Sequence, residues 1–179
     1  MTISACSSGS NRPSEADGKK IANETRRSVA ETYWQLYSSI DDAAFTTGAD
    51  GSFARCEKND QKLVRYTVRT ILDSRDSKGS KETEEQLTSA VAARFSRVGW
   101  HLSQGLHRSA TKGGIKAELL PPEFSGDTAT VAFEVQSKCV DVGSITDRLV
   151  DSYGPKTDVY ESSKKDAAPI PTTFPKPGV

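Results

Sequence analysis

Two stretches of alternating apolar and polar residues limit most strongly what this chain of 179 residues can fold into. In residues 62–73 (KLVRYTVRTILD), apolar or β-branched side chains occupy every second position from Val64 to Leu72. Residues 129–140 (ATVAFEVQSKCV) alternate in the same way. Because successive side chains of a strand point to opposite faces, the pattern predicts two strands of an antiparallel sheet with one face covered and one partly wet.

Further segments extend this sheet to about five strands. Residues 52–58 (SFARCEK) have the composition of a short strand. The segment from Trp100 onward begins the second half of the sheet, and residues 112–114 (KGG) are typical of a hairpin turn that leads into a strand at 115–120 (IKAELL).

Two other segments have the periodicity of helices. In the first, from Lys19 to about Asp42, apolar residues recur at three- and four-residue spacing, while charged residues such as Arg26 occupy the other faces. The second begins at residues 83–86 (TEEQ), which have the form of a capping box, and ends near Gly99. The order of elements predicts a two-layer α+β domain, in which two main helices lie on one face of an antiparallel sheet.

The chain divides into three parts. Residues 1–18 are interpreted as a start segment followed by a flexible tether, because they hold almost no large apolar side chains. Residues 19–154 form the single α+β domain, in which residues 144–147 (SITD) can cap a short final helix. Residues 155–179 contain five of the chain's eight prolines, so this tail is expected to be disordered or extended.

The charge balance and the hydropathy exclude several classes of function. The 24 Lys and Arg residues equal the 24 Asp and Glu residues in number, so no overall field draws the chain toward nucleic acid or an anionic membrane. No segment approaches the roughly 18 consecutive apolar residues of a membrane span. We therefore expect a soluble domain that does not bind nucleic acid.

Three cysteines bear on the cellular compartment. Cys56 and Cys139 fall in predicted strand segments, whereas Cys6 stands in the polar start of the chain. In an oxidising compartment this distribution predicts a Cys56–Cys139 disulfide with Cys6 left over. Such a bridge stabilises the fold by about 4–5 kcal/mol in the chain-entropy treatment. The alternative is a cytosolic protein with three reduced thiols.

The start of the chain resembles a bacterial lipobox. Residues 3–6 (ISAC) comprise an aliphatic residue, two small residues and a cysteine, and residues 7–10 (SSGS) resemble the tether that follows a lipidated cysteine. The resemblance implies that Cys6 carries several acyl chains, which together anchor the protein to a membrane. A signal peptide also needs a basic region and an apolar stretch, so these are expected to be encoded upstream of Met1 or to have been removed.

The whole chain is similar to the small surface lipoproteins of high-GC actinobacteria. The similarity rests on the lipobox-like start, a composition rich in Ala, Ser, Thr and Arg, a single Met, and the proline-rich tail. It implies a location on the outer face of the cytoplasmic membrane. It implies no common activity and supplies no catalytic residues.

The sequence contains no motif of a catalytic or metal site. His101 and His107 are the only histidines, and their spacing fits neither one helical face nor the HExxH zinc pattern. The serines lack a G-x-S-x-G elbow, and no phosphate-binding loop is present. Arg65 and Arg69 could bind an anion, but a solvated sheet face explains them equally well. No metal, cofactor or catalytic residue is therefore predicted.

Three aromatic residues are candidates for contact with a partner or ligand. Trp34 and Tyr37 cluster on the first predicted helix, and Trp100 follows the second. Exposed aromatic side chains often anchor partners. The alternative is that both tryptophans widen the core between the helices and the sheet, since Trp is highly buried on average.

These observations favour a non-enzymatic binding, accessory or regulatory module at the cell envelope. Its expected partners are the membrane, through acyl groups on Cys6, and an envelope protein or cell-wall material. Two alternatives remain open. One is an envelope hydrolase with a site assembled from dispersed residues, and the other is a cytosolic domain with free thiols.

Overall fold

The computed structural model describes residues 12–40, 42–46, 48–56, 63–74, 83–121, 129–152 and 158–161. In chain order the elements are α1 (Glu15–Ser38), β1 (Ala44–Phe45), β2 (Gly48–Arg55), β3 (Leu63–Ser74), α2 (Glu84–Arg97), β4 (Arg108–Lys112), β5 (Ile115–Leu120), β6 (Thr130–Ser137), β7 (Val140–Asp141), the 3₁₀ turn η1 (Gly143–Ile145), α3 (Thr146–Ser152) and β8 (Asp158–Glu161).

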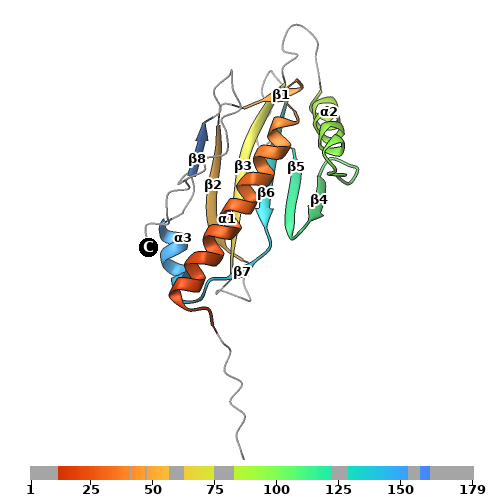
Figure 1. The fold of residues 1–179 in the computed structure, drawn as a ribbon. Coiled ribbons are helices and arrows are strands. Elements are labelled where there is room, and N and C mark those ends of the chain that lie inside the picture. Colours follow the sequence, from red (N-terminus) through yellow and green to blue (C-terminus); the bar gives the residue numbers. More distant parts are fainter. Residues whose placement is uncertain are drawn as a thin grey trace, which may run out of the picture.

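A single antiparallel sheet organises the described part of the chain (Figure 1). Its strands follow the order β4-β5-β6-β3-β2-β8, and the two-residue strands β1 and β7 also pair with β3. The long strand β3 pairs with β2 on one side and with β6 on the other. The two stretches with the clearest alternation are therefore neighbouring strands at the centre of the sheet.

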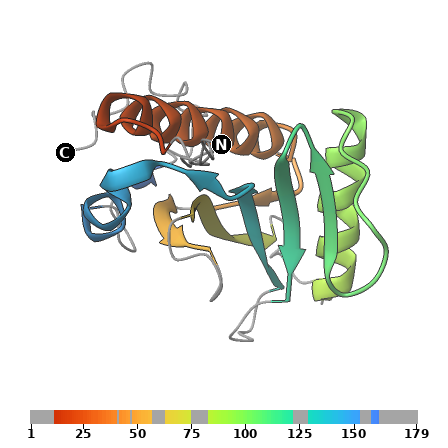
Figure 2. The same ribbon diagram turned by 90° about the horizontal axis from the view of Figure 1, so that it is seen from below.

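The helices lie on one face of this sheet, as the sequence predicts for an α+β fold (Figure 2). Phe133 of β6 lies between them. Its ring centroid is 5.2 Å from that of Tyr33 on α1 and 5.1 Å from that of Phe95 on α2. Leu149 of α3 is buried in the same core. One continuous core thus joins all three helices to one face of the sheet.

Local sequence signals account for the start of α2 and for the hairpin that joins β4 to β5. Thr83 and Gln86 form a complete capping box at the start of α2, with N–H···O distances of 2.8 Å and 3.2 Å. Gly113 and Gly114 connect β4 to β5 with φ values of 59° and 79°. Positive φ at both central residues is what a tight two-residue hairpin requires, and glycine adopts it without steric cost.

The start of α1 differs from the prediction. The helix begins at Glu15, four residues before Lys19, and the Ser14 side chain caps it by accepting a hydrogen bond from the Asp17 N–H. The last residues of the expected tether are therefore helical. Gly18 is buried against the carbonyl group of Val142, which anchors this first turn to the loop before η1.

Strand β2 also begins earlier than predicted, at Gly48 instead of Ser52. The glycines at 48 and 51 indicate a loop in the sequence, but Gly48 pairs with β8, and Gly51 pairs with both β3 and β8. This strand pairing outweighs the weak strand preference of glycine. Strand β8 falls within the proline-rich tail, and residues 162–179 lie outside the described residues.

Candidate functional site

The face of the sheet opposite the helices carries a row of charged side chains. Asp50 of β2 is the cross-strand partner of Arg69 on β3, and Arg69 is the partner of Glu134 on β6. Glu134 in turn lies opposite Glu118 on β5. We call this surface the open face. Its strand positions alternate with the buried ones, so the same pattern that builds the core also builds this charged row.

A groove of about 590 Å³ crosses the open face at β2 and β3. Its lining residues come from the β1–β2 connection, β2, β3 and β6: Thr46, Gly48, Asp50, Ser52, Thr67, Arg69, Thr70, Ile71, Asp73 and Glu134. This volume falls in the range of small-ligand sites. The lining is mainly polar, with Ile71 as its exposed apolar residue.

The residues that line the groove include more acidic than basic side chains, namely Asp50, Asp73 and Glu134 against Arg69. Arg69 forms an ion pair with Glu134, with 3.3 Å between Nε and Oε1. Among the described residues, Asp50 and Asp73 have no hydrogen-bond or ion-pair partner for their carboxylates. Burial raises the pKa of Asp73 above its usual range. The groove therefore presents an excess of acceptor oxygens, and a bound cation would relieve the desolvation of Asp73.

Glu118 forms a second polar cluster on the open face, beside the groove. Its side chain is only 4% exposed. The His107 Nε2 atom lies 2.6 Å and the Lys116 Nζ atom 2.7 Å from Glu118 Oε1, and Gln136 Nε2 donates to Oε2. Burial raises the pKa of Glu118, but the hydrogen bonds from Lys116 and His107 together outweigh it, so the pKa lies below its usual value. Both carboxylate oxygens of Glu118 already have hydrogen-bond partners, so this side chain stabilises the sheet and is not available to a ligand.

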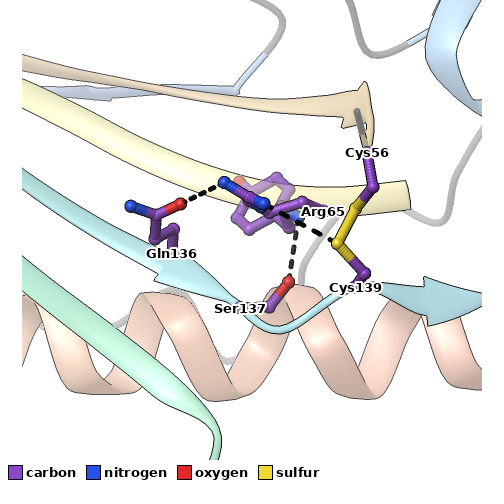
Figure 3. Close-up of a disulfide and its surroundings, with 6 residues drawn as sticks. Cys56, Arg65, Gln136, Ser137 and Cys139 are labelled. Atoms are coloured by element: carbon purple, nitrogen blue, oxygen red, sulfur yellow. Dashed lines mark hydrogen bonds between the residues drawn. A yellow bond between two sulfur atoms is a disulfide. The ribbon is translucent and has the colours of Figure 1, made fainter. Parts of the chain in front are cut away.

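Cys56 and Cys139 form the predicted disulfide (Figure 3). Their Cα atoms are 6.2 Å apart, and 83 positions separate them in the sequence. The bridge ties the residue after β2 to the segment between β6 and β7. It therefore closes one end of the three central strands covalently.

Arg65 of β3 contacts this bridge. Its NH2 group lies 3.7 Å from Cys139 Sγ, and its NH1 group donates to Gln136 Oε1 at 2.7 Å (Figure 3). Arg65 thus interacts with Gln136 and Cys139, and Arg69 with Glu134. These contacts within the sheet favour the solvated-face interpretation of the two arginines over an anion site.

The three candidate aromatic residues are not available to a partner. Trp34, Tyr37 and Trp100 are 4%, 9% and 4% exposed and belong to the hydrophobic core. Their interpretation as exposed partner contacts is therefore wrong, and the two tryptophans belong to the core, as the alternative states. Arg26, which the helical pattern places on a polar face, is 1% exposed.

The remaining site predictions are placed as follows. Cys6, the expected lipidation site, lies outside the described residues. His101 is exposed, and His107 is bound to Glu118, so neither histidine lines the groove. Within the described ranges, no three His, Cys, Asp or Glu side chains gather closely enough to hold a metal ion.

Sequence reasoning missed the groove. Asp50 stands in a Gly-Ala-Asp-Gly stretch that indicates a loop, and Asp73 stands at the end of a predicted strand. The alternation along β3 could have placed Asp73 on the same face as Arg69. Only the pairing of β2 with β3 brings Asp50 to the same surface.

Comparisons of the chain with models of protein families, with curated proteins and with solved structures gave no match. No helix in the described part of the chain has both the length and the apolar character needed to cross a membrane.

Proposed function

We propose that this protein is a non-enzymatic, extracytoplasmic binding module, anchored to the membrane through acyl groups on Cys6, that receives its ligand in the groove on the open face. The observation that carries the proposal is the groove of about 590 Å³ in which two carboxylates, Asp50 and Asp73, have no partner among the described residues. The Cys56–Cys139 disulfide supports the location, since disulfides persist in oxidising compartments.

The charges of the groove select the class of ligand. Glu134 already neutralises Arg69, so Asp50 and Asp73 leave the groove with a net negative charge. Opposite charge on a partner speeds its association and excludes partners of like charge. The ligand is accordingly a peptide or cell-wall fragment that presents an ammonium or guanidinium group. Hydroxyl groups of Ser52 and Thr67 would complement the polar backbone of such a ligand.

Titration with short peptides tests the binding proposal. Trilysine is added to the full chain, and binding is followed by isothermal calorimetry at low and high salt. Wild type is expected to bind trilysine in a saturable, salt-sensitive manner, and Asp50→Asn and Asp73→Asn each to weaken it about fivefold to tenfold, equivalent to about 1 kcal/mol.

The matched control removes one carboxylate elsewhere. Asp151→Asn changes the net charge by the same amount at an exposed position outside the groove. It is expected to leave trilysine binding unchanged. Equal binding of triglutamate, or equal weakening by Asp151→Asn and Asp50→Asn, would contradict the proposal.

Fractionation of the native host tests the anchor separately. Wild type is expected in the membrane fraction with labelled fatty acid attached, and Cys6→Ser in the aqueous fraction without label. The reading frame upstream of Met1 is expected to encode a basic segment followed by an apolar run of 7–15 residues. A stop codon directly upstream would overturn the lipoprotein assignment and leave the groove proposal intact.

One observation favours hydrolysis as a second candidate function. Burial raises the pKa of Asp73, which lines the same groove as Asp50 and Glu134, and a carboxyl group with a raised pKa among other carboxylates suits acid–base catalysis. Fluorogenic peptide, ester and glycoside substrates test it. Turnover that Asp73→Asn abolishes would replace the binding proposal, whereas turnover equal in both proteins would be contamination.

Thiol counting decides the cytosolic alternative. Protein purified from the native host is denatured without reductant and treated with a chromogenic thiol reagent. The envelope location predicts one reactive thiol, or none when Cys6 is acylated. Three reactive thiols would support a cytosolic protein.

A further inference from the structure

The disulfide has different surroundings at its two sulfur atoms. Arg65 NH2 lies 3.7 Å from Cys139 Sγ, and the described residues give no hydrogen bond from Arg65 to Cys56 (Figure 3). Both cysteine residues are half-buried rather than buried in the core. The positive charge therefore lies beside Cys139.

Neighbouring strands hold the Arg65 guanidinium in this position. Gln136 accepts a hydrogen bond from Arg65 NH1 at 2.7 Å and donates its own amide hydrogen to Glu118. Lys116 and His107 in turn hold the Glu118 carboxylate. The carboxylate on β5, the amide on β6, the guanidinium on β3 and the disulfide sulfur therefore form one continuous series of contacts. Because the Gln136 amide nitrogen donates to the carboxylate, the amide oxygen faces Arg65.

We propose that the Cys56–Cys139 disulfide is a directional site of thiol exchange, in which Cys56 receives an incoming thiol and Cys139 leaves as a thiolate stabilised by Arg65. An adjacent arginine favours the thiolate form of a cysteine. In thiol–disulfide exchange, the sulfur that better carries negative charge leaves faster, so the attack is directed to the other sulfur.

The reaction balances with a thiol as the co-substrate. A thiolate attacks Cys56 Sγ, a new sulfur–sulfur bond forms, the Cys56–Cys139 bond breaks, and its electron pair passes to Cys139. A second thiolate attacks the external sulfur of the mixed disulfide, and Cys56 leaves and takes a proton from water. Two external thiols are oxidised to one disulfide, and the protein gains two electrons. In the reverse direction, Cys139 is the nucleophile that closes the bridge.

Neither the two bridged cysteines nor Arg65 lines the groove, and the exchange does not depend on the lipid anchor. The chemistry requires only the disulfide, at one end of the central strands, and its neighbours. In both directions of exchange, the mixed disulfide with a cell-envelope thiol oxidoreductase or a low-molecular-weight thiol would form at Cys56.

Trapping of the mixed disulfide tests the direction. The full chain carrying Cys6→Ser, oxidised and folded, is exposed briefly to limiting glutathione and then to N-ethylmaleimide. Mass spectrometry of the digest locates each adduct. Glutathione is expected on Cys56 and maleimide on Cys139, with a preference of about tenfold over the opposite arrangement. Equal labelling of the two cysteines would overturn the proposal.

Variants of one strand separate the role of Arg65 from general effects of charge. Arg65→Gln is expected to reduce the preference for Cys56 and to slow reduction by glutathione about fivefold, while Arg65→Lys restores part of both. Arg69→Gln is the matched control, because Arg69 lies on the same strand and face but pairs with Glu134. Equal effects of Arg65→Gln and Arg69→Gln would overturn the assignment to Arg65.

Discussion

Tyr33 of α1 and Phe133 of β6 stack with their ring centroids 5.2 Å apart and their planes inclined by 15°. Phe133 also contacts Phe95 of α2, so a single side chain joins both long helices to the centre of the sheet. Phe133→Ala is expected to lower the free energy of unfolding by about 3–5 kcal/mol, because it removes a fully buried ring and leaves a cavity.

Urea denaturation followed by tryptophan fluorescence measures this change, since Trp34 and Trp100 are buried in the same core. Leu106→Ala is the control, because Leu106 is 76% exposed, and its effect should stay within about 0.5 kcal/mol. Equal losses from the two variants would contradict a core centred on Phe133.

Removal of the disulfide is expected to lower stability by an amount set by the length of the loop that it closes. With 83 positions between the cysteines, the Cys56→Ser, Cys139→Ser double variant should lose about 4–5 kcal/mol of unfolding free energy. The urea midpoint of wild type should fall toward that of the double variant on addition of a phosphine reductant. Cys6→Ser should retain the wild-type midpoint, and a double variant as stable as Cys6→Ser would contradict the bridge.

Gly18 is expected to resist substitution although it lies within a helix. A Cβ atom at this position would overlap the carbonyl oxygen of Val142, and a backbone atom cannot rotate away. Gly18→Ala should therefore lower the free energy of unfolding by about 1–3 kcal/mol. In an open helix, the same substitution would instead raise it by up to about 1 kcal/mol. Thermal unfolding measures the change, with Lys20→Ala, an exposed position of α1, as the control.

The pH dependence of stability should reflect Glu118. Its hydrogen bonds to Lys116 and His107 hold its pKa below the usual value in the folded state, against the effect of burial. The unfolded chain therefore binds the proton more readily, and the stabilisation, complete above about pH 4.3, is lost as the pH falls through the lower folded pKa. Glu118→Gln should flatten this acid limb in urea denaturation between pH 3 and pH 5. The exposed Glu85→Gln controls for charge, and an unchanged slope in Glu118→Gln would contradict the assignment.

Much of the fold could be predicted because its signals are local. The alternation in residues 62–73 and 129–140 marks β3 and β6, the capping box marks the start of α2, and the paired glycines mark the β4–β5 hairpin. Each of these patterns acts over a few residues, through the direction of side chains or the φ angles that glycine permits.

The candidate site could not be predicted in the same way. Asp50 and Asp73 share a groove because β2 pairs with β3 as far as Arg69, while β1 pairs with the end of β3. The glycines near Asp50 give a loop signal that strand pairing overrides. Arg26 and Trp34 are 1% and 4% exposed, and the periodicity of the helix alone does not reveal this burial.

The sequence by itself therefore determined the α+β class and the central strands, and it predicted the pairing of Cys56 with Cys139 for an oxidising compartment. Only the tertiary structure decided that Trp34 and Trp100 belong to the core, that Asp50 and Asp73 face one groove, and that Arg65 lies against Cys139 rather than Cys56. The physical reason is the separation along the sequence between the residues that each signal connects. Periodicity states which face of its own strand or helix a side chain occupies, whereas strand order and register, set by contacts between distant segments, decide which side chains meet.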